Sequence, residues 1–355
     1  MRNSLKIGEL SWWNTLKLRA SYGVTGNNSI SNTAAYPTLS AGNYAGAPGY
    51  KANSLGNADL GWETTESWNT GFESAWLGSR LFVDLDLYFS KTTDQIFTRD
   101  IPVMTGFKNM KSSMGQVNNR GVELTIRSVN INTQDWYWTT NLTFWLNRNK
   151  LVHLYGEDLN GDGKEDDDIS NSRFIGKPLG AIYGYQQDGI VQETDIEYMK
   201  ANGATPGIPK YKDMDNDGVI TSADRVILGY STPNFKLNMS NTITYKNWDL
   251  YFMLTGTFGG GGYYQKSNKG AYLTNGSGRF NTNGIYIPWW TPENKSNEYP
   301  AATFNDDGGR FLGLQNRAFV RLQDVTLSYT FREPWVQKVN IQNLKYSLRR
   351  KTYLR

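Results

Sequence analysis

Apolar and polar residues alternate with a period of two along most of this chain. From Leu81 onward, one face of a predicted strand carries Leu81, Val83, Leu85, Leu87 and Phe89, and the other carries Phe82, Asp84, Asp86, Tyr88 and Ser90. Similar stretches begin near Leu16, Glu63, Val117, Trp136, Phe235, Trp248, Phe319 and Ile341. The pattern predicts about nine strands, most of them near the ~9–11 residues that a tilted strand needs to cross a bilayer.

Two predicted hairpins bring like faces of adjacent strands together. One turn is placed at residues 246–247 and the other at residues 78–79. The resulting pairs are Tyr245–Trp248, Ile243–Leu250 and Phe235–Phe258 about the first turn, and Trp76–Leu81 and Phe72–Leu85 about the second. A slip of one residue would turn every apolar side chain to the wrong face, so the agreement of two independent hairpins supports this register.

The connections between the predicted strands alternate between short and long. The short turns are predicted at residues 78–79, 130–135, 246–247 and 332–340, and the long links at 91–115, 148–234 and 259–316. Outer-membrane barrels sort their connections in this way, with the long loops outside the cell, whereas a soluble β-sandwich has no reason to do so. The predicted fold is therefore all-β, part of a transmembrane antiparallel β-barrel with long extracellular loops.

Composition agrees with this fold and excludes several classes of function. Aromatic residues make up 14% of the chain, and the mean hydropathy is only −0.58. The sequence has no cysteine and a single histidine, His153, which nearly excludes thiol chemistry and histidine-centred sites. Lys+Arg number 37 against 33 Asp+Glu, so no basic stripe suggests nucleic acid as a partner. No signal peptide is visible at Met1, and no run approaches the ~18 apolar residues of a membrane helix.

One acidic segment, residues 213–224, has the spacing of a calcium-binding loop. The EF-hand oxygen-donor positions are held by Asp213, Asp215, Asp217, the Val219 carbonyl, Thr221 and Asp224. Gly218 stands at the sharp turn, but no helix pattern flanks the segment. We therefore predict a structural calcium ion and not an EF-hand sensor. The alternative is a metal-free turn whose carboxylates accept hydrogen bonds from backbone N–H groups.

A second acidic segment, residues 157–168, begins with the same spacing at Asp158, Asn160 and Asp162. It then departs from the pattern, because Glu165 occupies the usual apolar position and Ile169 the twelfth. This segment is interpreted as an acidic, solvated loop.

Other candidate sites are weaker. Trp289 and Trp290 lie in the longest glycine-rich loop region, where an exposed ring would stack on a sugar substrate, and the alternatives are loop packing or an aromatic belt. Asp84 and Asp86 face the predicted lumen, as channel-lining residues do. No arrangement predicts catalytic or cofactor-binding residues, so we expect that the protein is not an enzyme.

A series of segments also stands in a familiar order. They are TLKLRASYGVTGN (15–27), NADLGWETTESWNTGFE (57–73), GQVNNRGVELTI (115–126), GKPLGAIYGYQQDGI (176–190), DMDNDGVITSADRVILG (213–229), WWTPENKSNEYPA (289–301) and FVRLQDVTLSYTF (319–331). Together they resemble the SusC/RagA family of TonB-dependent outer-membrane transporters, and the resemblance covers nearly the whole chain.

The resemblance implies a barrel of about 22 strands with an N-terminal plug. It implies uptake of glycans, oligosaccharides or peptides across the outer membrane of Gram-negative bacteria of the Bacteroidetes type. The implied partners are outer-membrane lipid, a SusD-like surface lipoprotein, and the TonB complex acting through the plug region.

On this basis residues 1–355 are interpreted as a partial TonB-dependent receptor β-barrel domain in which the plug domain and the last strand are absent. Residues 148–234 are expected to form a long extracellular loop region that carries the calcium-like loop at 213–224. The basic ending after Leu344 is interpreted as a segment that is not a strand. The alternative function is a secreted β-rich calcium-binding adhesin or carbohydrate-binding module. In that case Leu85, Leu87, Ile243 and Leu250 would face a core instead of lipid.

Overall fold

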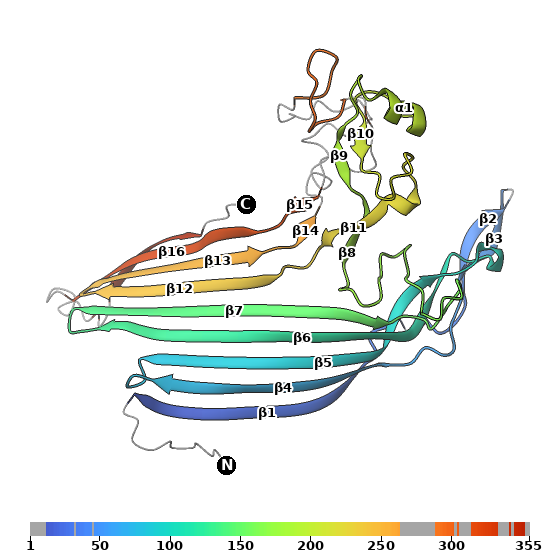
Figure 1. The fold of residues 1–355 in the computed structure, drawn as a ribbon. Coiled ribbons are helices and arrows are strands. Elements are labelled where there is room, and N and C mark those ends of the chain that lie inside the picture. Colours follow the sequence, from blue (N-terminus) through green and yellow to red (C-terminus); the bar gives the residue numbers. More distant parts are fainter. Residues whose placement is uncertain are drawn as a thin grey trace. The chain divides into compact units, whose positions relative to one another are not determined.

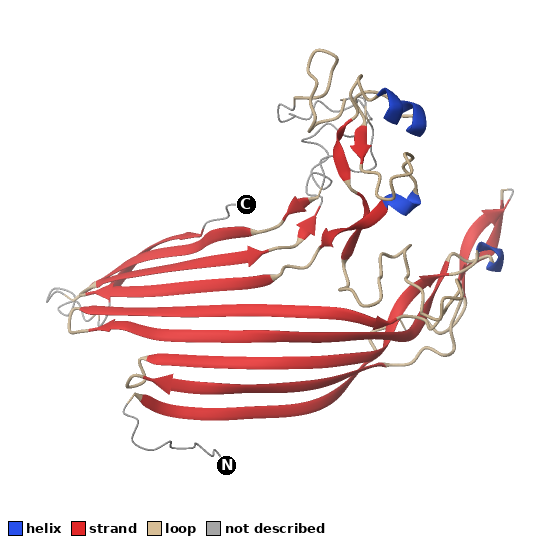
Figure 2. Cartoon of the chain, viewed as in Figure 1, coloured by secondary structure: helices blue, strands red, loops and turns tan. Residues whose placement is uncertain are grey.

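The computed structural model describes residues 12–31, 33–44, 46–262, 288–301, 304, 314–332, 341 and 344–351. Its regular structure is almost entirely β-strand (Figure 2). The chain divides into two compact units: unit 1 comprises Met1–Leu179, Asn234–Phe258 and Ala318–Arg355, and unit 2 comprises Gly180–Pro233 and Gly259–Arg317. Within the described ranges, no helix is long and apolar enough to cross a membrane.

Unit 1 is built on a sheet of nine strands in the order β1-β4-β5-β6-β7-β12-β13-β16-β17 (Figure 1). These strands are β1 (Trp13–Asn27), β4 (Glu63–Trp76), β5 (Leu81–Asp100), β6 (Asn109–Asn132), β7 (Trp136–His153), β12 (Phe235–Tyr245), β13 (Trp248–Phe258), β16 (Phe319–Phe331) and β17 (Leu344–Lys351). Each is antiparallel to its neighbours. The predicted number of strands and the fold class are confirmed. In the sequence, β1 and β4 are separated by a hairpin of β2 (Thr38–Tyr44) and β3 (Ala47–Ser54), which is not part of the nine-stranded sheet.

Both predicted hairpin registers are confirmed. In β12 and β13, Tyr245 pairs with Trp248, and the pairing continues without a shift to Phe235 and Phe258. In β4 and β5, Trp76 pairs with Leu81 across a turn formed by residues 77–80. We call the end of the sheet with the connections 77–80, 133–135 and 246–247 the short-turn end. The predicted short turn at 332–340 lies almost wholly outside the described residues.

The predicted long link over residues 91–115 is wrong. Strand β5 continues to Asp100 and β6 begins at Asn109, so the connection is residues 101–108 with a short 3-10 helix, η1 (Val103–Thr105). The register of β5 against β6 shifts twice between Thr92 and Ile96. Such bulges add an unpaired residue and interrupt the alternation of side chains, which removed the pattern on which the prediction relied.

The interpretation of the basic ending is also wrong, because Leu344–Lys351 forms β17 and pairs with β16. Leu348 lies opposite Leu327, while Arg349 extends on the other face and donates a hydrogen bond of 2.9 Å to Asp324. A carboxylate on the neighbouring strand therefore neutralises a cation that the sequence pattern took as a mark of a solvated tail.

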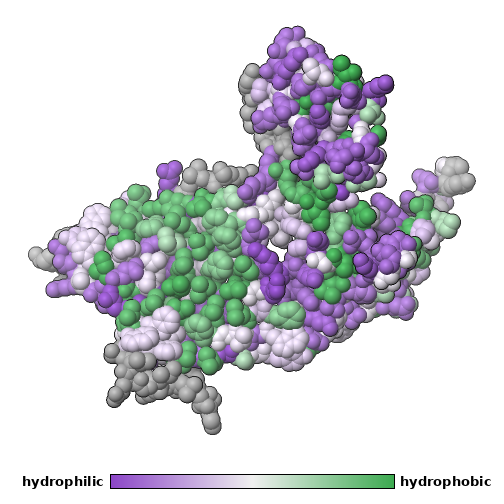
Figure 3. Space-filling model, viewed as in Figure 1, coloured by the Kyte–Doolittle hydropathy of each residue, from purple (hydrophilic) through white to green (hydrophobic). Residues whose placement is uncertain are grey.

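One face of the nine-stranded sheet, which we call the apolar face, carries continuous rows of hydrophobic side chains. One row runs across six strands through Leu18, Phe72, Leu85, Leu124, Phe144 and Leu237. Figure 3 shows hydrophobic residues gathered over this sheet. Among the described residues, none of the buried hydrophobic side chains belongs to the apolar face, and Leu87 is 44% exposed. Within the part of the chain that the structure describes, the face therefore has no covering layer of protein.

Rows of aromatic residues bound the apolar face at both ends. At the short-turn end the paired residues are Trp136, Tyr245, Trp248, Tyr329 and Tyr346. At the other end, Tyr22, Trp68 and Phe89 follow one another with ring centroids 5.2 and 5.6 Å apart. A strand of 11 residues such as β12 rises about 26 Å at a tilt near 40°, which matches the apolar band of a membrane barrel.

Residues 154–179 form a small core with the strands at the end opposite the short turns. Leu151 and Leu154 are fully buried, and they pack with Val117 and Phe97. The backbone of this segment also extends the pairing of β7, since the Gly176 N–H donates to the Leu151 carbonyl at 2.8 Å. The segment is therefore a folded part of unit 1 and not an unstructured loop.

Unit 2 contains short paired elements from two chain segments. The first segment holds β8 (Ala181–Tyr185), β9 (Gln187–Ile190), α1 (Ile196–Asn202), β10 (Pro209–Tyr211), η2 (Ser222–Asp224) and β11 (Arg225–Tyr230). The second includes β15 (Gln315–Asn316), which pairs with β14 (Gly261–Gly262). Strand β8 pairs with β11, and β9 pairs with β10.

Candidate functional site

The face opposite the apolar face, which we call the polar face, carries an ion-pair network near the sheet edge formed by β1. Arg19 donates hydrogen bonds to Asp84 and Asp86 at 2.5 and 2.6 Å and also pairs with Glu73. Lys17 donates to Glu73 at 3.1 Å. Asp84 and Asp86 therefore lie on the predicted polar face, but Arg19 holds both, which leaves neither as an isolated catalytic carboxylate.

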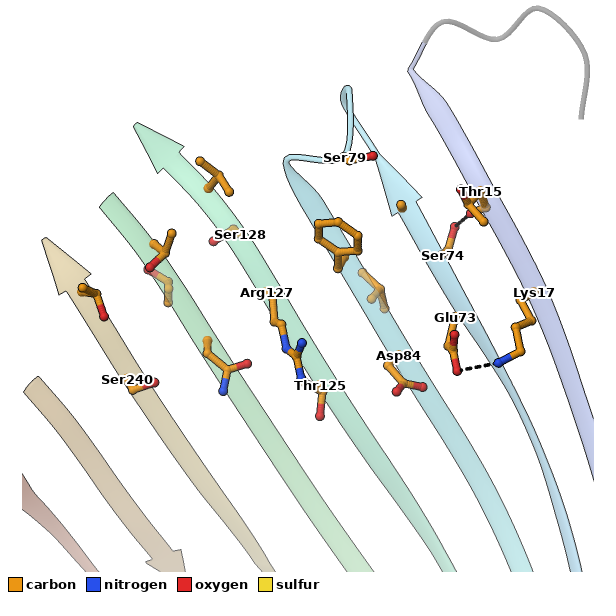
Figure 4. A pocket seen from close by; sticks show the side chains of 18 of the residues that line it. Thr15, Lys17, Glu73, Ser74, Ser79, Asp84, Thr125, Arg127, Ser128 and Ser240 are labelled. Carbon is orange, nitrogen blue, oxygen red and sulfur yellow. Dashed lines mark hydrogen bonds and ion pairs between the residues drawn. The ribbon is translucent and has the colours of Figure 1, made fainter. Parts of the chain in front are cut away.

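The polar face is hollowed toward the short-turn end. A hollow of about 1120 Å³ is lined mainly by polar and charged side chains, including Lys17, Glu73, Asp84, Thr125, Arg127 and Ser240. Figure 4 shows these side chains on neighbouring strands, with Lys17 and Glu73 joined by a hydrogen bond. Such a surface is suited to water and polar solutes, in contrast to the apolar face.

The apolar face contains one polar cluster that the sequence pattern did not reveal. Asn241 is buried, and its Oδ1 accepts hydrogen bonds from Trp138 Nε1 at 2.9 Å and Thr140 Oγ1 at 2.6 Å. Asn130 in turn donates to Thr140 at 2.7 Å. Polar groups that face hydrocarbon must be satisfied within the protein, and these side chains satisfy one another. The sequence signals are the breaks in alternation at Asn241, between Met239 and Ile243, and at Thr140, between Trp138 and Leu142.

Three of the predicted calcium ligands come together in unit 2. Carboxylate oxygens of Asp213, Asp215 and Asp224 all lie within 4.8 Å of one another. Oxygens bound to one calcium ion at ~2.3–2.6 Å are at most about 5 Å apart, so the spacing of these three carboxylates is compatible with a shared ion. Asp224 is fully buried, and Asp215 is exposed.

Asp217 is not part of this group of three carboxylates, and Asp217 and Thr221 each accept a backbone hydrogen bond. Asp217 accepts a hydrogen bond from the Val219 N–H at 2.8 Å, and the Thr221 hydroxyl accepts one from Ala223 at 3.2 Å. The turn predicted as the alternative is thus present in the same loop, because its carboxylates also cap backbone N–H groups.

Charge repulsion contributes to a raised pKa of Asp215. The hydrogen bond from the Asp217 N–H, which favours the ionised form, is outweighed by the combined effect of desolvation and the nearby carboxylates of Asp217 and Asp224. Hydrogen bonds from the N–H groups of Thr221 and Met214 lower the pKa of Asp224. Asp213–Asp224 lies between β10 and β11 and has no flanking pair of α-helices, which agrees with the prediction that it is not an EF-hand.

The second acidic loop repeats the same backbone arrangement. Asp158 accepts from the N–H groups of Gly161 and Gly163 at 2.7 and 2.9 Å, as Asp213 accepts from Asn216 and Gly218 at 2.6 and 2.7 Å. No comparable group of three acidic side chains forms in this loop, whose residues are all described.

Glu165, which breaks the calcium pattern of the second loop, stabilises the folded segment of residues 154–179. Its carboxylate accepts from the N–H groups of Leu154 and Gly156 at 2.7 Å each, and His153 Nδ1 lies 2.6 Å from it. Burial alone would raise the pKa of Glu165, but these hydrogen bonds outweigh it and lower the pKa. The single histidine is therefore part of a structural contact.

The two predicted substrate-contacting tryptophans have different environments. Trp290 is buried and its Nε1–H donates to Gln192 Oε1 at 2.9 Å, so this ring packs inside unit 2, as the loop-packing alternative proposed. Trp289 is only partly buried, and its carbonyl accepts from Asn294 at 2.7 Å. A substrate contact at Trp289 stays a prediction.

An uncovered apolar face between two aromatic rows, with a charged and hollowed face behind it, defines the wall of a membrane-spanning β-barrel. A soluble sandwich would bury Leu85, Leu87, Ile243 and Leu250 in a core, and none of these four is buried. The geometry therefore supports the barrel and not the alternative of a secreted binding module.

Comparison with known proteins gives the family. The family described as "TonB dependent receptor-like, beta-barrel" matches residues 6–344. TonB-dependent receptor P3 of Formosa agariphila is 30% identical over 345 residues, which cover 93% of this chain and 34% of that protein. TonB-dependent receptor SusC of Bacteroides thetaiotaomicron is 29% identical over 340 residues, which cover 90% of this chain and 32% of SusC. The chain belongs to the β-barrel family of TonB-dependent receptors.

The fold is similar to that of a solved SusC-like transporter. The structure of the RagAB peptide transporter superposes with a TM-score of 0.73 at 23% identity, covering 98% of this chain and 38% of that chain. This chain spans about a third of the length of the curated relatives it matches. Proteins of this family are outer-membrane transporters and not enzymes.

Proposed function

We propose that this chain forms part of the barrel of an outer-membrane transporter of the SusC/RagA type. The observation that carries the proposal is the sheet itself, with an uncovered apolar face toward lipid and a charged, hollowed face toward the lumen. In this proposal the polar face walls the path of the substrate, and the chain supplies no reacting group. Transport is driven by the TonB complex.

The proposed substrates are oligosaccharides or other glycans, with peptides as the second class. The name of the RagAB peptide transporter is what supports peptides as the second class. Residues 148–234 lie on the extracellular side in this proposal and face a SusD-like surface lipoprotein. Partly exposed side chains of unit 2 such as Trp289 would then be available to the substrate.

The test is uptake by cells that lack the gene for the full-length protein. We expect these cells to lose uptake of labelled oligosaccharides or of labelled peptides, and we expect the loss to be reproduced by removal of TonB. We also expect the full-length protein to fractionate with the outer membrane and to resist extraction by salt. Unchanged uptake of both classes, together with recovery of the protein in the soluble secreted fraction, would exclude the proposal.

Unit 2 is also proposed to hold a structural calcium ion at Asp213, Asp215 and Asp224, with Asp217, the Val219 carbonyl and Thr221 as the further predicted ligands. The proximity of the three carboxylates and the raised pKa of Asp215 support this assignment. The ion would relieve the repulsion between these carboxylates and would stiffen the loop.

Asp215→Asn is expected to weaken calcium binding by about tenfold or more, because charge at the ligands sets the affinity of such loops. The measurement is calorimetric titration of the detergent-purified full-length protein, together with calcium-dependent protection of residues 180–233 from protease. Asp162→Asn is the matched control. Asp162 lies in the second acidic loop, where no cluster of three carboxylates forms, so this substitution should leave calcium binding unchanged. Equal cleavage of the unmutated protein with and without calcium would leave only the metal-free turn.

A further inference from the structure

Four cationic residues lie on the apolar-face side of the sheet, two in line with the aromatic row that ends it and two beyond that row. Arg120 pairs with Phe89, the last residue of that row, and Arg148 pairs with Arg120. Two residues further along the same three strands, Lys91 and Lys150 stand on either side of Asn118. We call Arg120, Arg148, Lys91 and Lys150 the cationic rows.

The pairing places these four charges close together. Directly paired residues on antiparallel strands have Cβ atoms about 4.5–5.5 Å apart, and residues two apart on a strand are separated by roughly 7 Å. Arg120 and Lys150 are exposed, and Arg148 and Lys91 are partly exposed. Like charges in adjacent positions repel one another, so this arrangement is unfavourable unless an anion accompanies it.

No carboxylate of the described chain supplies that anion. Among the described residues, none of the four cations forms an ion pair, although Glu66 lies on the neighbouring strand opposite Lys91. Arg148 donates instead to the backbone carbonyl of Asn234 at 2.6 Å. The polar face differs, because there Lys17 and Arg19 are neutralised by carboxylates on β4 and β5.

The position of the cationic rows indicates which anion they meet. Aromatic rows mark the depth at which the hydrocarbon of a membrane ends and the headgroups begin. On the same outward surface, Arg120 and Arg148 stand in line with the aromatic row, and Lys91 and Lys150 stand two residues further along their strands, so the four side chains stand at headgroup depth. A guanidinium matches phosphate oxygens with two parallel hydrogen bonds, and an ammonium adds a point charge.

We propose that the cationic rows bind the phosphate groups of an anionic lipid in the outer leaflet of the membrane. The inference rests on the proposed function for the orientation of the barrel. The lipid chains lie on the apolar face beside Tyr22, Trp68 and Phe89, and the phosphates lie against Arg120, Arg148, Lys91 and Lys150. The contact fixes the depth of the barrel in the membrane at the end opposite the short turns.

The test uses the full-length protein, purified in neutral detergent and reconstituted into phosphatidylcholine vesicles that contain either diphosphoryl lipid A or its dephosphorylated form. Lipid retained after gentle re-extraction is counted by native mass spectrometry. Arg120→Gln with Lys150→Gln is expected to lower retention of diphosphoryl lipid A by about tenfold, and added salt should weaken retention by the unmutated protein.

Arg127→Gln with Lys236→Gln is the matched control, since it removes one arginine and one lysine from the polar face, on the strands β6 and β12 that flank β7. The control should retain the lipid as the unmutated protein does, and neither protein should retain the dephosphorylated lipid. Equal retention by the Arg120/Lys150 variant, or equal retention of the dephosphorylated lipid, overturns the proposal. Displacement of the lipid by inorganic phosphate would assign the site to free phosphate and would also overturn it.

The outcome is separable from failure of the proposed function. A reconstituted protein that floats with the vesicles and keeps its strand content, but retains no lipid A, contradicts only the lipid site. A protein that does not float with the vesicles contradicts the barrel function itself.

Discussion

Replacing Met239 with arginine is expected to destabilise the membrane-inserted protein by about 2–4 kcal/mol, the cost of a cation at the middle of the lipid-facing surface. Met239 lies on the apolar face, where it pairs with Leu142 and Leu254. It stands near the centre of β12, between the aromatic residues Phe235 and Tyr245. The measurement is reversible unfolding of the full-length protein in vesicles by urea, with the yield of folded protein in the outer membrane as a second readout.

Ser240→Arg is the matched control for this prediction. Ser240 is the next residue along the strand, but it lines the hollow of the polar face, where an arginine side chain reaches water. We expect its effect to stay within about 1 kcal/mol, because lumen-facing positions tolerate charge. A larger loss from Ser240→Arg than from Met239→Arg would mean that the two faces have been assigned the wrong way round.

Leu151→Ala is expected to open the folded segment of residues 154–179. Leu151 is fully buried with Leu154, Val117 and Phe97, and removing a buried leucine side chain costs about 2–5 kcal/mol. Since ~1.4 kcal/mol corresponds to a tenfold change in an equilibrium constant, cleavage of the segment should accelerate by at least about tenfold. Limited trypsin digestion of the membrane-inserted protein measures this, because Lys164 and Arg173 provide cleavage sites within the segment.

The same segment supplies a control in Leu159, which is 83% exposed. Leu159→Ala removes the same atoms without leaving a cavity, so its cleavage rate should match that of the unmutated protein. If Leu151→Ala is cleaved no faster than Leu159→Ala, the segment is not held by this core.

The sequence predicted the barrel wall well because lipid and lumen impose opposite demands on alternate residues. The hairpin registers at Tyr245–Trp248 and Trp76–Leu81 followed from parity alone, and both are present. The prediction of strands failed where the alternation of apolar and polar residues was interrupted by a bulge or by an ion pair. In β5 the bulges between Thr92 and Ile96 shift the parity, and in β17 the carboxylate of Asp324 compensates Arg349.

The candidate sites were less predictable, because they depend on contacts between distant residues. The sequence spacing was enough to predict that Asp213, Asp215 and Asp224 lie together, since the ligands of such a loop are close in sequence. Spacing gave no indication that Trp290 would be buried against Gln192, 98 residues away. The mutual pairing of Asn241 with Trp138, across 103 residues, was equally hidden.

The construction of unit 2 from two chain segments has a consequence for the exchange of segments between relatives. Residues 288–301 are held against residues 189–207 by the contact of Trp290 with Gln192 and by the Ala301 N–H, which donates to the Gly207 carbonyl at 2.7 Å. Trp290 packs so closely on Gly207 that a Cβ atom at this position would lie 2.6 Å from the indole ring. Exchanging one segment for that of a relative would leave such contacts unmatched. Grafts between relatives should therefore give a folded unit 2 when both segments are transferred together.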